Sequence, residues 1–155
     1  GKNPETLFGQ QAASARRVKE SGIETISMGY ILVDGGKESA AAPATGTTAI
    51  SAAEPETIAD TALAGEMLGL HSIYLEAGSG AAVPAGAGLI ARVRKSVACP
   101  LIVGGGIHTS EQAEAAWQAG ADIVVVGNHL EQRPEELPLF AEARNMFNNK
   151  QITKL

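Results

Sequence analysis

The sequence has one cysteine, few aromatic residues and no cluster of basic residues, and each shortage excludes a class of protein. Cys99 cannot form an internal disulfide, so a reducing, cytoplasmic setting is expected. The net charge is -5 and Lys and Arg nowhere form a run. We therefore expect no nucleic-acid partner, because binding a phosphate backbone needs clustered basic side chains. No apolar stretch approaches the ~20 residues of a membrane-spanning helix, so no transmembrane segment is expected.

Glycine and small apolar residues are abundant instead. Aromatic residues make up 4% of the chain, whereas 18 of its 155 residues are glycine. The core must therefore consist mainly of Ala, Val, Ile and Leu, and the backbone must turn tightly at many places. A chain of this length can bury a substantial core, so residues 1–155 are expected to form a single domain.

Hydrophobic periodicity predicts helices that alternate with strands along the whole chain. Asn3 and Pro4 are suited to begin a first helix, and Thr109 with Gln112 has the spacing of a capping box. A long stretch of small residues, 35–53, is predicted to be a loop over the mouth of an active site. The expected helices span 3–22, 55–68, 84–98, 108–120 and a segment from 134 that frays at 148–155; the expected strands span 23–33, 72–76, 99–107 and 121–128.

The expected strands are nearly continuous apolar runs, which is typical of a parallel sheet that helices cover on both faces. Each strand ends in glycine, and α/β folds bind their ligands at the carboxyl ends of parallel strands. Four strands are half of the eight in a (β/α)8 barrel. An open four-stranded sheet is the alternative, but its two bare edges would be a liability. The favoured fold class is therefore α/β of the TIM-barrel type, with only the C-terminal four strands present and the first strands absent.

Two glycine loops suggest a phosphate site. Gly104, Gly105 and Gly106 lie between a strand and a helix, and Gly127 with Asn128 follows the last strand. Without side chains the backbone can approach an anion closely, and barrels often bind phosphate between their last two strand-to-helix loops. A glycine after a strand is also ordinary turn chemistry, but two consecutive loops of this kind favour phosphate.

The stretch YLEAGSG adds a carboxylate and a hydroxyl to these loops. Tyr74 and Glu76 share one face of their strand, and Ser79 follows between two glycines. A buried Glu76 beside a phosphate could hold or deprotonate a hydroxyl, although a strand-end glutamate can equally form an ion pair. His108 could help to neutralise the phosphate. The three histidines and Asp34 show no metal-ligand spacing, so no metal site is expected within the chain.

Four motifs in this order resemble the geranylgeranylglyceryl phosphate synthase family and its bacterial heptaprenylglyceryl phosphate synthase relatives. The motifs are GYILVDGG, YLEAGSG, PLIVGGGI and ADIVVVGN. The likeness begins at NPETLFGQ and extends to about Asn128, and TALAGEMLGL also fits it. The resemblance implies a modified TIM barrel and a prenyltransferase of lipid biosynthesis. Such an enzyme joins a prenyl diphosphate to sn-glycerol 1-phosphate and releases diphosphate with the help of Mg²⁺, which gives the ether core of archaeal-type lipids.

The resemblance also implies roles for individual residues. Glu76, with Tyr74 beside it, would act on the attacking hydroxyl, and Tyr30 would lie near the glycerol or the prenyl head. The family's metal-binding acidic residue lies on its first strand, so the Mg²⁺ ligands are expected in the missing N-terminal part. The remaining residues implied to bind glycerol phosphate are Leu75, Ala77, Gly78, Ser79 and Gly80 around the glycerol, and Gly105, Gly106, Gly127 and Asn128 around the phosphate.

Two other interpretations remain open at this point. A different phosphate-binding barrel enzyme, such as a sugar-phosphate isomerase, would use the same loops but need no prenyl diphosphate. A non-catalytic half-barrel would instead self-associate through its open strand edges, and a homo-oligomer is expected in either case. The loop 81–90 and the alanine-rich stretch 37–50 depart from the family's pattern, and the activity of this chain alone stays open.

Overall fold

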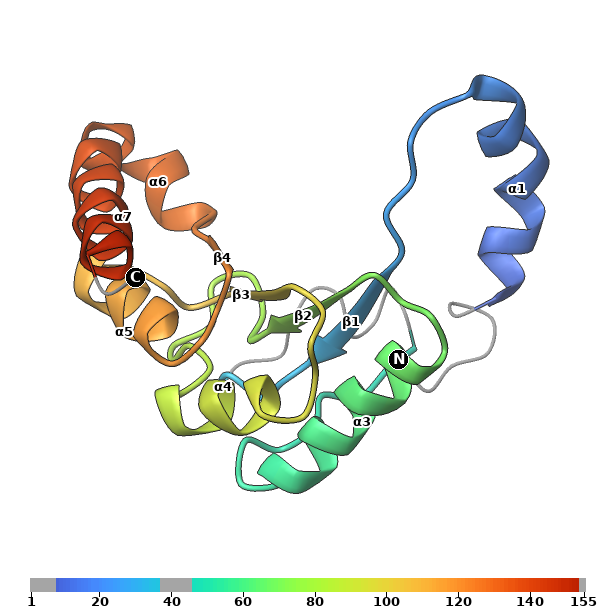
Figure 1. The fold of residues 1–155 in the computed structure, drawn as a ribbon, viewed down its shortest axis with the longest axis horizontal. Coiled ribbons are helices and arrows are strands. Elements are labelled where there is room, and N and C mark those ends of the chain that lie inside the picture. The colour runs from blue at the N-terminus through green and yellow to red at the C-terminus, as the bar shows by residue number, and fades with distance from the viewer. Residues whose placement is uncertain (1–7, 37–45, 154–155) are drawn as a thin grey trace.

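A four-stranded parallel sheet forms the centre of the computed structural model, which describes residues 8–36 and 46–153 (Figure 1). The strands lie side by side in their chain order, β1-β2-β3-β4, as consecutive strands of a β/α barrel do. The α/β fold of barrel type is thus confirmed. The strands are β1 (Met28–Leu32), β2 (Ser72–Glu76), β3 (Leu101–Gly104) and β4 (Ile123–Val125).

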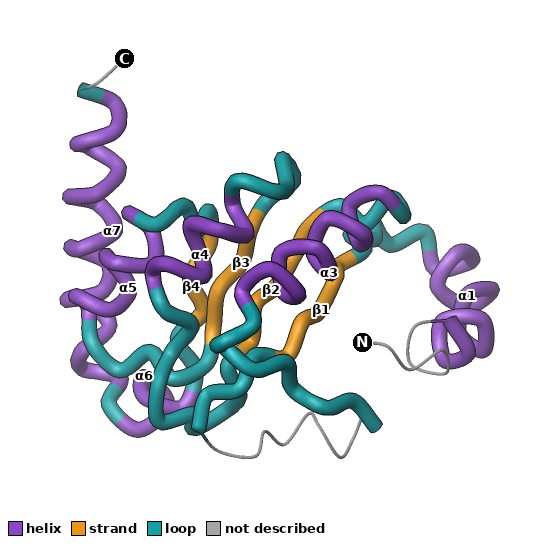
Figure 2. Tube along the Cα trace, turned by 90° about the horizontal axis from the view of Figure 1, so that it is seen from below, coloured by secondary structure: helices purple, strands orange, loops and turns teal. Residues whose placement is uncertain are grey.

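Helices cover one face of this sheet. Figure 2 shows α3, α4 and α5 on the same side of the strands, and α7 packs against α5. Within the described residues, no helix is long and apolar enough to cross a membrane. The helices are α1 (Gln10–Ser21), α3 (Pro55–Met67), α4 (Ala87–Arg94), α5 (Ser110–Gln118), α6 (Asn128–Gln132), the 3-10 turn η2 (Pro134–Glu136) and α7 (Leu137–Ile152).

The core lies between the sheet and these helices, and it is built from aliphatic side chains as expected. Ile73 and Leu75 of β2 are fully buried, and they share a cluster with Ile58 of α3 and Val93 of α4. Within 84–98, the range predicted for the third helix, Leu89, Ile90, Val93 and Val97 are all buried. At ~25 cal/mol per Å² of apolar surface, this burial is the main force that closes helices onto the sheet.

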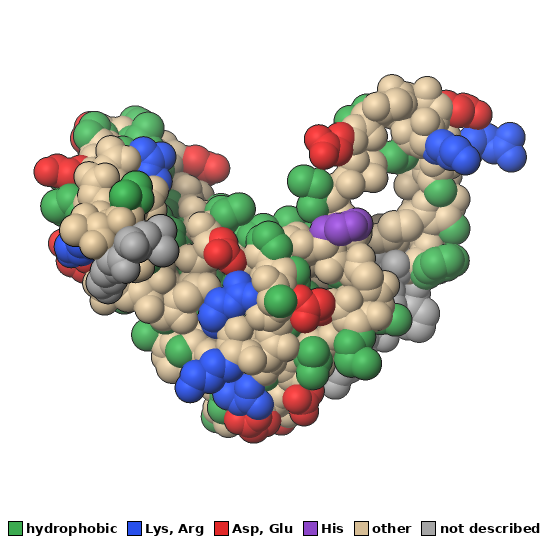
Figure 3. All heavy atoms as spheres, viewed as in Figure 1, with side chains coloured by type: hydrophobic (Ala, Val, Ile, Leu, Met, Phe, Trp, Pro, Cys, Tyr) green, Lys and Arg blue, Asp and Glu red, His purple; other side chains and the backbone are tan. Residues whose placement is uncertain are grey.

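The opposite face of the sheet is open. Tyr30 is 38% exposed there, and Ile123 and Val125 of β4 are 49% and 40% exposed. Figure 3 shows the hollow between the arm that carries α7 and the arm that carries α1, with acidic and basic side chains mixed over the visible surface. The expectation that both faces of the sheet are covered is therefore wrong for the described residues, because their helices pack on one face only.

The N-terminal part of the chain differs from the sequence prediction. Asn3 and Pro4 lie outside the described residues, and α1 ends at Gly22 (φ +67) as expected, but it has no buried residue and stands apart from the sheet (Figure 1). The expected strand 23–33 is shorter: β1 begins at Met28, because β2 offers it partners only from Ser72 onward. Residues 37–45 of the loop 35–53 also lie outside the described residues.

Three predictions nearer the C-terminus are also wrong. The third helix begins at Ala87 and ends at Arg94 instead of spanning 84–98, since Pro84 belongs to a loop that packs against Gly106. Asn128 begins a short helix, α6, that was not expected. The tail does not fray at 148: α7 continues to Ile152, because Lys150 pairs with Glu114 at 3.3 Å and Trp117 stacks on Phe147.

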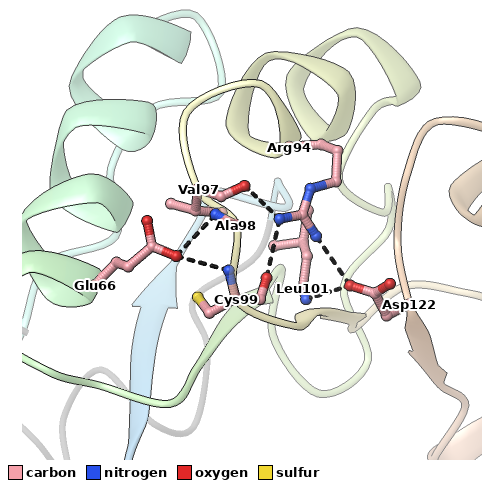
Figure 4. A network of polar contacts seen from close by, with 7 residues as sticks. All are labelled: Glu66, Arg94, Val97, Ala98, Cys99, Leu101 and Asp122. Atoms are coloured by element: carbon pink, nitrogen blue, oxygen red, sulfur yellow. Dashed lines mark hydrogen bonds and ion pairs between the residues drawn. The ribbon is translucent and has the colours of Figure 1, made fainter.

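A polar network ties together the loops at the amino ends of the strands (Figure 4). Arg94 donates hydrogen bonds to the carbonyl oxygens of Val97 and Cys99 and to Asp122. Asp122 in turn accepts a bond from the N–H of Leu101, at 2.8 Å. Beside it, Glu66 Oε1 accepts bonds from the N–H groups of Ala98 and Cys99, at 2.8 and 2.6 Å. The first residue of β3 and the loop before it are thereby fixed to α3, to α4 and to the start of β4.

Candidate functional site

A cavity of about 330 Å³ opens at the carboxyl ends of the strands, on the uncovered face of the sheet. The loops after β2, β3 and β4 form its wall, and Tyr30 of β1 closes one side. Loops that follow parallel strands are the usual ligand site of α/β folds. The cavity is lined by Tyr30, Tyr74, Glu76, Ser79, Gly80, Gly105, Gly106, Ile107, His108, Val125, Gly127, Asn128 and His129.

Glu76 is the buried carboxylate of this cavity. Its residue is only 7% exposed, and Oε1 accepts a hydrogen bond from the N–H of Gly78 at 2.8 Å. The N–H of Ala77 donates to the carbonyl of Gly104 at 3.0 Å, so the loop after β2 is held against β3. A carboxylate with one oxygen fixed in this way can still accept a hydroxyl proton from a ligand.

Gly105 has to be a glycine for this arrangement to form. Its φ of +81° is in the left-handed region, and a Cβ there would lie 2.5 Å from Glu76 Oε1 and 2.6 Å from the nitrogen of Gly78. Gly106 is similarly constrained, with φ +70° and a would-be Cβ 2.9 Å from the nitrogen of Pro84. The absent side chains therefore leave backbone, and no Cβ, at the cavity wall.

Two tyrosines stand beside Glu76. The rings of Tyr30 and Tyr74 meet edge to face with centroids 5.1 Å apart. Burial and then the Glu76 carboxylate raise the pKa of Tyr30 to about 12, and the same two causes raise the pKa of Tyr74 further. Both phenols therefore keep their protons at neutral pH, and that of Tyr74 is hydrogen-bonded to the Glu76 carboxylate.

The loop after β2 also contacts the segment after β4. The Ser79 hydroxyl donates to Asn128 Oδ1 at 2.8 Å, although 49 residues separate them in sequence. Asn128 is the first residue of α6, and Gly127 precedes it. This bond joins the two loops that the sequence assigned to glycerol and to phosphate, so both border the same cavity.

The loop after β3 leads directly into α5, whose first turn is capped. The Thr109 side chain accepts from the N–H of Gln112, and Gln112 Oε1 accepts from the N–H groups of Thr109 and His108. The predicted capping box is therefore confirmed. It fixes His108 at the cavity wall, next to Gly106 and Ile107.

Nine of the twelve residues that the resemblance assigned to the site line the cavity, and three do not; His108, suggested separately, lines it too. Ala77 is 1% exposed and Leu75 is fully buried in the core under the helices. Gly78 acts through its N–H on Glu76. These three support the site from behind. The residues brought together at the cavity are Tyr30, Tyr74, Glu76, Ser79, Gly80, Gly105, Gly106, Gly127 and Asn128.

Sequence reasoning missed His129, Val125 and Ile107 as parts of the wall. His129 was overlooked because its two neighbours in the structure, His108 and Glu136, are not adjacent to it in the sequence. Its position directly after the Gly-Asn pair was the available signal. The cavity's potential metal ligands are one carboxylate and two imidazoles, and no three His, Cys, Asp or Glu side chains within residues 8–36 and 46–153 are grouped to hold a metal ion. The described residues therefore do not fit a Mg²⁺ site.

Curated relatives of this chain are similar over nearly its whole length. The chain is 46% identical over 152 residues to the geranylgeranylglyceryl phosphate synthase of Spirosoma linguale, which covers 98% of this chain and 61% of that protein. It is 45% identical over 135 residues to the synthase of the same name from Thermococcus gammatolerans, covering 84% of this chain and 51% of the relative. The chain thus spans between about half and three fifths of these relatives.

Solved structures give the same picture. The (S)-3-O-geranylgeranylglyceryl phosphate synthase of Thermoplasma acidophilum, in complex with its substrate sn-glycerol-1-phosphate, superposes with a TM-score of 0.81 at 30% identity, over 96% of this chain and 58% of that one. Wild-type GGGPS from Thermoplasma volcanium gives 0.81 at 31% identity, over 96% and 57%. A family model, described as the PcrB family, matches residues 1–144. The resemblance seen in the four motifs is thereby confirmed, and the chain belongs to the PcrB family.

Proposed function

We propose that this chain binds sn-glycerol 1-phosphate in the cavity and, as part of a prenyltransferase, joins its terminal hydroxyl to a prenyl diphosphate of the geranylgeranyl type. The observation that carries the proposal is the position of the Glu76 carboxylate in a cavity that also has glycine loops in its wall. Glycerol phosphate needs both partners, one for a hydroxyl and one for a phosphate. The complex of the Thermoplasma acidophilum relative with sn-glycerol-1-phosphate supports this choice of ligand.

The proposed reaction forms one C–O bond and breaks another. The hydroxyl oxygen attacks the first carbon of the prenyl chain, and the bond from that carbon to the diphosphate breaks, so that diphosphate leaves with the bonding electrons. The hydroxyl proton passes to Glu76, from which solvent removes it. Tyr30 and Tyr74 stay protonated; Tyr74 orients Glu76 through its hydrogen bond, and Tyr30 lies beside the glycerol.

The other residues of the site position the substrate in this proposal. Ser79, Gly80, Gly105, Gly106, Gly127 and Asn128 surround the phosphate, and Leu75, Ala77 and Gly78 hold the loop after β2 in place. Mg²⁺ would neutralise the leaving diphosphate. Its ligands remain predicted outside the described residues, and none of the steps above depends on them.

Calorimetric titration with sn-glycerol 1-phosphate and its enantiomer sn-glycerol 3-phosphate tests the binding step. We expect the 1-phosphate to bind more tightly, since Glu76 and the glycine loops fix the hydroxyl and the phosphate at once. Equal binding of the two, or none, would contradict the proposal. Addition of geranylgeranyl diphosphate and Mg²⁺, with product detection by mass spectrometry, tests the transfer. A sugar-phosphate isomerase would form no prenylated product.

The transfer itself is tested with Glu76→Gln, which keeps the shape of the side chain and removes its basicity. Loss of a general base lowers turnover by roughly 10²–10⁴-fold. Glycerol phosphate should still bind, because the amide oxygen can accept the bond from Gly78. Unchanged turnover in this variant would remove Glu76 from the reaction.

We also propose that the chain forms a homo-oligomer. Among the described residues, no strand pairs with the outer edge of β1 apart from the bridge between Val33 and Ile50, and cavities of about 580 and 340 Å³ lie along that edge. An open edge of this kind favours pairing with another chain. Light scattering after size exclusion should give a mass above 15.9 kDa; a monomer at all concentrations would contradict this.

The cytoplasmic setting that the single cysteine suggests likewise stays a prediction.

A further inference from the structure

The cavity wall is poor in positive charge for a phosphate site. None of its lining residues is Lys or Arg, and Glu76 adds a negative charge. Within the described part of the chain, His108 and His129 are therefore the only side chains of this wall that can become cationic. The sequence suggested His108 as a residue that could help to neutralise the phosphate, whereas His129 had no role assigned to it.

His129 is held by a carboxylate behind it. Its Nε2 lies 2.7 Å from Glu136 Oε2, and the other oxygen of Glu136 accepts from Arg133 at 2.9 Å. These two hydrogen bonds lower the pKa of Glu136, so it is ionised at neutral pH and its oxygens can only accept. Nε2 of His129 must therefore carry the proton, and Nδ1 is the nitrogen that remains to gain one.

His108 is also held through its Nε2 atom, in this case by a backbone carbonyl group. Its Nε2 lies 3.3 Å from the carbonyl oxygen of Ala81, and a carbonyl can only accept, so Nε2 is again the donor and Nδ1 the basic atom. The two imidazoles meet edge to face with centroids 5.8 Å apart. Without an anion nearby, two positive rings at this separation would repel each other. A bound phosphate dianion would remove that penalty.

We propose that His108 and His129 form the cationic wall of the phosphate site, and that a bound phosphomonoester dianion takes up a proton from solvent onto this pair. The inference rests on the proposed function, since it assumes the same ligand and the same cavity. The charged and titratable groups around the pair are Glu136 and Arg133 behind His129, and Glu76, Tyr30 and Tyr74 across the cavity. Binding should consequently tighten as pH falls through the range in which histidine gains its proton.

The test compares wild type with the double variant H108Q/H129Q. Glutamine is polar and can donate one hydrogen bond, but it cannot be protonated. Calorimetry with sn-glycerol 1-phosphate should show about tenfold weaker binding by the variant near pH 6, and less than about twofold near pH 8. The ligand's own second ionisation, near pH 6, is common to both proteins and cancels in their ratio. Wild type should also take up protons on binding, seen as a dependence of the heat on the buffer's ionisation enthalpy, and the variant should not.

His71→Gln is the matched control, because His71 contacts Ser27 at the amino end of β2, away from the cavity. It should bind as wild type does at every pH. A ratio between wild type and double variant that does not change with pH, or equal proton uptake by both, overturns this inference and leaves the proposed function intact. Failure of wild type itself to bind overturns both. Thermal melts of each variant exclude misfolding as the cause.

Discussion

The two ends of the strands differ in what holds them. At the amino ends, the side chains of Arg94, Asp122 and Glu66 bond to backbone groups and to one another, and they fix the loops (Figure 4). At the carboxyl ends, glycines replace side chains and a cavity remains beside a buried carboxylate. The same sheet thus has a stabilising end and, in the function proposed above, a ligand-binding end, a division typical of β/α barrels. Substitutions should separate ligand affinity from stability according to the end at which they fall.

The largest effect on affinity is expected from Gly105→Ala. The new Cβ would lie 2.5 Å from Glu76 Oε1, on a backbone that side chains rarely adopt, so the carboxylate and its loop must move. We expect glycerol phosphate binding to weaken by about a hundredfold or more, since displaced site residues commonly have effects of this size. Titration calorimetry measures it.

Gly88→Ala is the control for this change. Gly88 is in α4, and a Cβ there meets nothing within 4 Å. Because alanine is the better helix former by about 1 kcal/mol, the variant should bind normally and be slightly more stable. Weakened binding in Gly88→Ala would show that the assay reports general disturbance of the fold.

The largest effect on stability is expected from Arg94→Met. Methionine keeps part of the stem that packs on Gly120 but removes the guanidinium, which leaves the carbonyls of Val97 and Cys99 and the Asp122 carboxylate without it. The free energy of unfolding should fall by about 2 kcal/mol, and ligand affinity should change by less than about twofold. Urea unfolding and calorimetry give the two numbers.

Arg144→Met provides the comparison. Arg144 is exposed on α7 and its guanidinium bonds only locally in the described structure, to the side chain of Asn145. Its loss should change stability by no more than about 0.5 kcal/mol. If Arg94→Met weakened binding as strongly as Gly105→Ala, the division between the two ends would be wrong.

A smaller effect on affinity is expected from Ser79→Ala. The change removes the bond to Asn128 that joins two loops of the cavity. Binding should weaken by about three- to tenfold, which corresponds to the net free energy that one hydrogen bond contributes. Ser14→Ala on α1 also removes a hydroxyl, one that donates to Gln10, but it should leave affinity unchanged. Equal losses in both variants would contradict the role given to Ser79.

The smallest expected effect is a change in the pH dependence of stability when Glu66 is replaced by Gln. Hydrogen bonds from the N–H groups of Cys99 and Ala98 lower the pKa of Glu66 from its ordinary 4.5. A carboxylate with a depressed folded-state pKa stabilises the fold above the unfolded value, and this contribution is lost as pH falls through the lowered pKa. Acid unfolding of Glu66→Gln, followed by circular dichroism below pH 4.5, should therefore have a shallower pH slope than wild type. An unchanged pH slope in Glu66→Gln would contradict this role of Glu66.

The sequence predicted which residues gather at the cavity better than it predicted the rest of the fold. Buried strands are apolar runs and their loops are marked by glycine, so Gly105, Gly127 and Asn128 could be placed at one edge of a sheet before the structure was known. The period-two rule likewise placed Tyr74 and Glu76 on the same face.

The elements that were misplaced depend on contacts between distant residues. Polar sequence at 148–152 predicts fraying, yet the pairing of Lys150 with Glu114 and the stacking of Phe147 on Trp117 hold α7 in place. No pattern among neighbouring residues of the sequence predicts such contacts. His129 was overlooked for the same reason, because its partners become neighbours only when α6 and η2 fold against the loop after β3.

The most direct measurement is an NMR titration of the backbone amides with sn-glycerol 1-phosphate and, separately, with sn-glycerol 3-phosphate. The account predicts shifts at the carboxyl ends with the 1-phosphate, much weaker shifts with the 3-phosphate, and none at the amino ends. The amides to compare are those of Gly105, Gly106, Gly127 and Asn128 with those of Ala98, Cys99 and Leu101. Shifts that do not distinguish the enantiomers, or that appear equally at both ends, would contradict the claim that this cavity is a stereoselective glycerol phosphate site.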